Sequence, residues 1–103
     1  MRIYHVYILA SISRVLYTGM SGNLGVRLWA HRSKRDPKSF TAQYNVTKLV
    51  YLEEYSNPVD AILREKQIKA WRRSKRVNLI ESLNPEWEDL ASELVAEVPV
   101  SML

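Results

Sequence analysis

The chain has 103 residues, the size of one small domain with a single hydrophobic core. Its 47% hydrophobic and 25% charged residues are typical of a globular protein and exclude a disordered or collagen-like chain. The absence of cysteine excludes disulfides, thiolate zinc sites, iron-sulfur clusters and cysteine nucleophiles. The sequence contains no apolar run of about eighteen residues and no secretory signal, so we expect a cytoplasmic protein without a membrane span.

Charge is distributed unevenly along the chain. Residues 1–80 hold all fifteen lysines and arginines and five acidic residues, whereas residues 81–103 hold six acidic residues and no basic one. A strongly basic body favours a polyanionic partner, because binding releases condensed counterions. The pattern indicates nucleic acid as a partner, with a basic surface kept for solubility as the alternative. It also divides the chain into a domain, residues 1–90, and an acidic and apolar tail, residues 91–103.

A hairpin of two strands is expected at the N-terminus. Residues 3–9 and 15–18 are rich in β-branched and aromatic side chains, which favour strands. A connection centred near Ile12 would place Tyr7 opposite Tyr17 in an antiparallel ladder. The two phenols would then share one face.

A helix is expected directly after the hairpin. Residues 19–22 read as a turn, and Asn23 is positioned to cap a helix over residues 24–34. Arg27 and His31 follow the cap at intervals of four residues, so they lie along one edge of this helix. The spacing predicts a polar stripe beside a buried one.

The rest of the chain is expected to contain a loop, a strand and two further helices. The expected ranges are loop 36–45, strand 47–52, helix 58–73 and helix 75–83. Asn57 and Pro58 are a strong helix start, and the Asn-Pro pair at 84–85 ends the last helix. The order is therefore two strands, a helix, a strand and two helices.

Several common catalytic motifs are missing from the sequence. Its three glycines match neither the nucleotide-binding P-loop nor the dinucleotide fingerprint, and no His-Glu-x-x-His zinc motif occurs. Neither histidine has a nucleophile elbow nearby, which argues against a serine triad. The remaining candidates for chemistry are Tyr7, Tyr17, Gly19, Asn23, Arg27, His31, Glu65 and Asn84.

At these residues the chain resembles the GIY-YIG nuclease superfamily, and in particular its small standalone members, which are similar to the catalytic domain of the excision-repair incision subunit. Residues 5–7 read His-Val-Tyr, with histidine in the glycine position of the first signature, and residues 17–19 read Tyr-Thr-Gly. Arg27 and His31 match the family's first helix, and Glu65 matches its glutamate-bearing helix. The order and spacing of these residues are more specific than either tripeptide alone.

The resemblance covers about residues 3–90 and implies an α+β fold, a three-stranded antiparallel sheet flanked by helices (β-β-α-β-α-α). It implies a metal-dependent endonuclease that hydrolyses DNA phosphodiester bonds in repair or recombination, with Mg²⁺ or Mn²⁺ as cofactor. Branched or damaged DNA is the substrate that we expect, and RNA and a protein partner stay open. The alternatives are a non-catalytic nucleic-acid-binding module of the same fold and a protein-interaction domain that uses the tail.

Glu65 is the residue that the resemblance assigns to the metal. Mg²⁺ is a hard cation that takes one or two carboxylates and keeps several waters. An ordinary helical ion pair with Lys69, four residues on, is the alternative role. Glu53 and Glu54 are the runner-up ligands, although acids at the end of a strand are often simply solvated.

The remaining catalytic candidates act on the phosphate and on the attacking water. Arg27 would bind phosphate oxygens and stabilise the charge of the transition state. The resemblance implies that Tyr7 helps to activate water while Tyr17 and His31 orient groups or relay protons, and it leaves open which takes the proton. The reference pKa of a phenol is about 10, so the metal and Arg27 are expected to lower it. Core packing is the alternative for both tyrosines, and Gly19 is expected to allow a close backbone approach or a positive φ.

Further contacts to nucleic acid are expected from residues around these. The candidates are Asn23, Lys69, Arg72, Arg73 and Asn84. Basic side chains over residues 66–76 could bind backbone phosphates without reading sequence, and a solvated helix face is the alternative. For Asn84, the helix stop before Pro85 is a sufficient local explanation.

Overall fold

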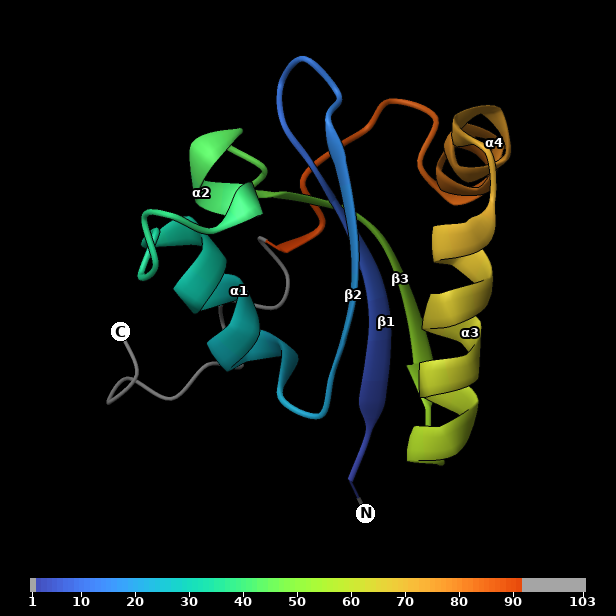
Figure 1. Ribbon diagram of the computed structural model, residues 1–103. Coiled ribbons are helices and arrows are strands. Elements are labelled where there is room, and N and C mark those ends of the chain that lie inside the picture. The colour runs from blue at the N-terminus through green and yellow to red at the C-terminus, as the bar shows by residue number, and fades with distance from the viewer. Residues whose placement is uncertain (1, 92–103) are drawn as a thin grey trace.

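The computed structural model describes residues 2–91 (Figure 1). The strands are β1 (Tyr4–Ala10), β2 (Leu16–Ser21) and β3 (Lys48–Tyr55). The helices are α1 (Leu24–Arg32), α2 (Phe40–Gln43), α3 (Pro58–Ala70) and α4 (Arg73–Leu83). Apart from Ala91, the expected tail lies outside the described residues. Within the described part, no helix has the length and apolar character that a membrane span requires.

The three strands form one antiparallel sheet in the order β2-β1-β3, which confirms the predicted α+β fold. β1 is the central strand, and its side chains alternate between two layers. Val6 and Ile8 pack with α3 and α4, whereas Tyr7 and Leu9 pack with α1. Figure 1 shows α1 and α2 on one side of the sheet and α3 and α4 on the other. The central strand therefore contributes to both cores.

The register of the hairpin differs by two residues from the prediction. Tyr7 pairs with Gly19, and Tyr17 pairs with Leu9. Because side chains alternate along a strand, a shift of two residues keeps each on its face. The two phenols therefore do share a face, with their ring centroids 6.4 Å apart.

The connection between β1 and β2 explains this difference in register. The hydroxyl of Ser11 accepts a hydrogen bond from the backbone N–H of Val15 at 2.9 Å, and Arg14 closes the turn with a φ of +67°. The turn is thus centred on Ser13 rather than Ile12. β2 also continues to Ser21, through residues that the sequence suggested as a turn.

Two predicted helix caps are confirmed. The side chain of Asn23 accepts from the N–H of Val26 at 3.2 Å, and that of Asn57 accepts from Val59 at 2.8 Å. α3 ends three residues earlier than predicted because Trp71 is extended, with ψ of 148°. This break lets α4 start at an angle to α3, as Figure 1 shows.

The predicted loop over residues 36–45 contains the short helix α2. The hydroxyl of Ser39 caps it by accepting from the N–H of Ala42 at 3.3 Å. A helix of four residues is too short to show a hydrophobic period, so the pattern of residues does not predict it. Thr41 in this helix is buried, and its hydroxyl contacts the ring of His31 on α1.

A charged cluster attaches α3 to the sheet. The carboxylate of Glu53 on β3 accepts hydrogen bonds from Nε and Nη2 of Arg64, both at 2.9 Å. It also accepts from the hydroxyls of Tyr51 and Tyr55. Burial alone would raise the pKa of Glu53, but these hydrogen bonds outweigh it and lower the pKa. The cluster attaches α3 to β3 at Arg64, the residue directly before Glu65.

Candidate active site

Side chains from three elements meet on the α1 side of the sheet. Tyr7 comes from β1, Tyr17 from β2, and Arg27 and His31 from α1. The ring of His31 lies 6.2 Å from that of Tyr7 and 5.4 Å from that of Tyr17, between centroids. Arg27 is close enough for its charge to affect the pKa of both Tyr7 and His31. The structure thus brings together these four predicted catalytic residues.

Tyr7 is buried, and its hydroxyl lies directly over Gly19 of the neighbouring strand. A Cβ at position 19 would be 2.5 Å from the phenolic oxygen and 2.6 Å from Cζ. Gly19 has no positive φ, so its role is the close approach and not a special backbone conformation. Glycine at this position is therefore what allows the phenol to point towards the β2 edge.

His31 connects Tyr7 to α2. Its Nε2 lies 3.3 Å from the Tyr7 hydroxyl and its Nδ1 lies 2.8 Å from Oγ1 of Thr41. Burial, followed by the charge of Arg27, lowers the pKa of His31, so the imidazole is neutral at pH 7. A neutral imidazole carries one N–H and one lone pair, so the two hydroxyls take complementary donor and acceptor roles. Thr41 was missed because the sequence did not predict α2.

The pKa of Tyr7 is raised, which corrects the expectation that it would be lowered. Burial is the largest cause, and Tyr17 and Glu65 act in the same direction. Arg27 does lower the pKa of Tyr7, as expected, but burial outweighs its effect. The phenol is therefore protonated at neutral pH and can donate a hydrogen bond.

Glu65 joins this group from α3, although α3 packs on the opposite side of the sheet. Glu65 shares a helix face with Ala61 and Ile68, which are buried against the sheet. Its side chain is 21% exposed, and its Oε1 lies 3.5 Å from Nζ of Lys69. Its negative charge contributes to the raised pKa of Tyr7, so it lies within electrostatic range of the phenol. The ion pair with Lys69, which was the alternative to the metal role, is present, and Glu65 also lies near Tyr7.

The carboxylates differ in how well they fit a divalent cation. Among the described residues, no group of three or more histidine, aspartate or glutamate side chains could hold a metal ion. Glu53 is engaged by Arg64, and Glu54 is 68% exposed beside His5, with Oε1 and Nε2 3.6 Å apart. Glu65 remains, and one carboxylate fits Mg²⁺ or Mn²⁺, which keeps waters and takes oxygens of a bound phosphate. It does not fit a closed zinc site.

The residues predicted to bind nucleic acid are distributed over the start of α1, the junction of α3 and α4, and the end of α4. Asn23 caps α1, and Lys69 lies beside Glu65. Arg72 is exposed at the junction of α3 and α4. Arg73 donates from Nη2 to the carbonyl oxygen of Arg14 at 2.7 Å, which ties α4 to the hairpin.

Asn84 is buried and holds the turn after α4. Its Nδ2 donates to the carbonyl oxygens of Val50 and Glu88 at 3.0 and 2.9 Å, and its Oδ1 accepts from the N–H of Glu88 at 2.9 Å. Asn84→Ala should lower the free energy of unfolding by about 2–3 kcal/mol, because buried backbone groups lose their partners. Urea denaturation measures this change. A weaker affinity for DNA at unchanged stability would contradict the structural role and favour the predicted binding role.

Comparison with known proteins agrees with the fold and with the resemblance found in the sequence. The sequence matches the GIY-YIG catalytic domain family over residues 3–78. The UPF0213 protein of Syntrophus aciditrophicus is 37% identical over 82 residues, covering 80% of this chain and 93% of that protein. A UPF0213 protein of Clostridium perfringens is 36% identical over 90 residues, covering 87% and 96%.

A solved structure supports the fold independently. The solution NMR structure of the UPF0213 protein BH0048 from Bacillus halodurans has a TM-score of 0.56 to this chain at 23% sequence identity. The match covers 84% of this chain and 92% of that one. From the family match, the related sequences and the shared sheet and helices, the chain belongs to the GIY-YIG catalytic domain family.

Proposed function

We propose that this protein is a metal-dependent endonuclease that hydrolyses phosphodiester bonds in DNA. The observation that carries the proposal is the convergence of a guanidinium, an imidazole and a carboxylate around the buried phenol of Tyr7. Hydrolysis of a phosphodiester needs groups that neutralise phosphate charge and groups that move a proton from water. Both kinds of group are present within this small region.

Glu65 is the residue that would hold the cation, Mg²⁺ or Mn²⁺. When bound, such a cation supplies positive charge that polarises the phosphate. Arg27 is exposed on α1, and its planar guanidinium can donate two parallel hydrogen bonds to phosphate oxygens. Tyr17 packs against His31 and orients its ring. These residues neutralise and position the substrate.

Tyr7 and His31 form the proton path in this proposal. We assign the N–H of Nδ1 to Thr41, which leaves the lone pair of Nε2 to accept from the Tyr7 hydroxyl. The Tyr7 oxygen takes a proton from the attacking water as its own proton moves to Nε2 of His31. Because Tyr7 keeps one proton throughout, its raised pKa does not prevent this transfer.

The test is nicking of supercoiled plasmid and of a branched duplex with Mg²⁺, with Mn²⁺ and with chelator. Wild-type protein should cut only with metal, and Glu65→Ala should lower the cutting rate at least about a hundredfold because the cation loses its ligand. Asp60→Asn is the matched control, since it removes an exposed carboxylate from the same helix. Circular dichroism and DNA binding establish that each variant is folded.

Two results would contradict the proposal. Equal cutting by wild type and Glu65→Ala would show that Glu65 does not hold the metal. Binding of DNA without cutting at any metal concentration would favour the non-catalytic nucleic-acid-binding module. A parallel RNA substrate decides between the two nucleic acids, and preference for the branched duplex would support a role in repair or recombination.

A further inference from the structure

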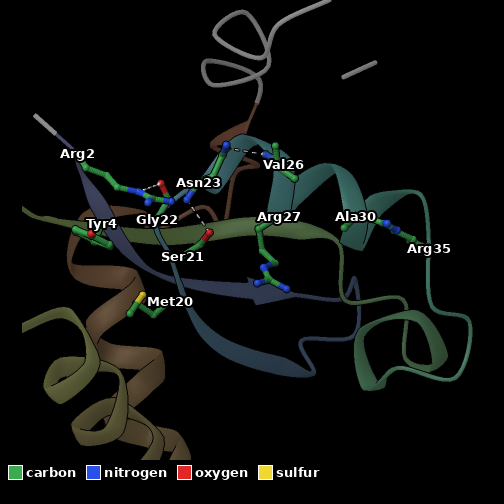
Figure 2. Close-up of a pocket in the computed structure, with 10 residues that line it drawn as sticks. All are labelled: Arg2, Tyr4, Met20, Ser21, Gly22, Asn23, Val26, Arg27, Ala30 and Arg35. Atoms are coloured by element: carbon green, nitrogen blue, oxygen red, sulfur yellow. Dashed lines mark hydrogen bonds between the residues drawn. The ribbon is translucent and has the colours of Figure 1, made fainter. Parts of the chain in front are cut away.

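A groove beside the candidate active site contains three arginines (Figure 2). Its volume is about 500 Å³, within the range of sites that hold small ligands. The residues that line it are Arg2, Tyr4, Met20, Ser21, Gly22, Asn23, Val26, Arg27, Ala30 and Arg35. None of these ten described residues is acidic, so the groove favours an anion.

The groove is continuous with the candidate active site, because Arg27 belongs to both. In Figure 2, Arg2 and Arg35 lie towards opposite ends of the groove, with Arg27 between them. α1, which separates Gly22 from Arg35, has nine residues and is thus about 14 Å long. Consecutive phosphates of one duplex strand lie farther apart than the axial rise of about 3.4 Å, because the strand also winds around the axis, so a groove of this length spans a few consecutive phosphates.

Arg2 is held at the rim of the groove. Its Nε donates to the carbonyl oxygen of Gly22 at 3.4 Å, and its guanidinium lies 5.6 Å from the ring centroid of Tyr4. A Cβ at position 22 would be 2.9 Å from Nε of Arg2, so the side chain rests against the glycine. These contacts leave both Nη groups free to bind a phosphate oxygen.

We propose that this groove holds the sugar-phosphate backbone of the cut strand, with Arg2 and Arg35 binding phosphates on either side of the one at Arg27. The position of the cut phosphate rests on the proposed function. The apolar parts of Tyr4, Met20 and Val26 in the same groove suit contact with the sugars. Because the contacts are to the backbone, they position the strand and do not read its sequence.

The test measures DNA affinity against salt concentration by fluorescence anisotropy, in chelator so that nothing is cut. Arg2→Gln and Arg35→Gln should each reduce the slope of log affinity against log salt by about 0.9 for a duplex and about 0.7 for a single strand. Lys48→Gln is the matched control. It removes one positive charge at the other end of the sheet, where Lys48 pairs with Ala10, and should change the slope far less.

Gly22→Ala tests the position of Arg2 without changing the charge. Gly22 has no positive φ, so alanine is compatible with the backbone, but its Cβ would push the Arg2 guanidinium aside. This variant should weaken binding about as much as Arg2→Gln, and combining the two changes should add little. Thermal unfolding establishes that each variant is folded.

The proposal is overturned if the salt slopes of both arginine variants match that of Lys48→Gln. It is also overturned if inorganic phosphate displaces DNA far better than chloride at equal ionic strength, which would assign the groove to a small phosphorylated ligand. Binding is measured without cleavage. A protein that binds DNA through the groove but never cuts it would therefore refute the proposed nuclease function and still support the role of the groove. If the protein does cut, Arg2→Gln should raise KM and leave kcat unchanged.

Discussion

Tyr7→Phe is expected to lower the rate of DNA cleavage by about two to four orders of magnitude without unfolding the protein. The phenyl ring keeps the buried packing on β1, and only the hydroxyl that faces His31 is lost. Loss of that single hydrogen bond should cost about 1 kcal/mol of stability. Single-turnover cleavage of a labelled duplex, with thermal unfolding in parallel, measures both effects.

Tyr44→Phe is the matched control for this change. Tyr44 is 52% exposed on the far side of Phe40, and the variant removes the same atom. Its cleavage rate should stay within about twofold of wild type, since surface changes of this kind have little effect. Wild-type cleavage by Tyr7→Phe would show that no proton passes through the phenol, and would favour direct activation of water by His31.

Glu53→Ala is expected to lower the free energy of unfolding by about 3 kcal/mol. The side chains of Glu53 and Arg64 are only 16% and 23% exposed, so the arginine would keep a largely buried charge without its partner. Two tyrosine hydroxyls would lose their acceptor as well. Urea denaturation monitored by circular dichroism measures the change.

The neighbouring Glu54→Ala is the control, because Glu54 is 68% exposed and should contribute less than about 0.5 kcal/mol. The pKa of Glu53 also predicts how the stability of the protein changes with pH. The pKa of Glu53 is lower in the folded protein than its ordinary value of 4.5, so its contribution is present above that value and lost as pH falls through the folded pKa. Wild type should therefore lose more stability on acidification than Glu53→Ala. Equal stability of Glu53→Ala and Glu54→Ala at neutral pH would contradict this account.

The parts of the fold that depend on local chemistry could be predicted from the sequence. Asn23 and Asn57 cap their helices through hydrogen bonds to residues two or three positions away. Bonds of this kind depend on neighbouring residues only, so the local sequence predicts them. The hairpin register was wrong because it depended on Ser11 and Arg14 in the connection, which carry no strong turn signal. α2 was missed because four residues are too few to show a hydrophobic period.

The candidate site divides in the same way. The interval of four residues placed Arg27 and His31 on one side of α1, and alternation along the strands placed both tyrosines on one face. Thr41 and the arginines that flank the groove were not predicted, because their positions depend on contacts between distant segments. The direction of the pKa shift of Tyr7 was wrong for the same reason, since burial is a property of the folded chain.

The order in which the strands of the sheet pair also implies that the parts of the candidate site form at different times during folding. The hairpin closes through a five-residue connection, whereas pairing of Tyr4 with Tyr55 must close a long loop that contains all the residues between them. Long loops cost more entropy to close, so such distant pairs form late. The phenols, the arginine and the histidine all precede residue 32, while Glu65 follows the late pair. A newly made chain thus acquires its carboxylate last, so under the proposed function a half-folded molecule would lack the residue that holds the cation.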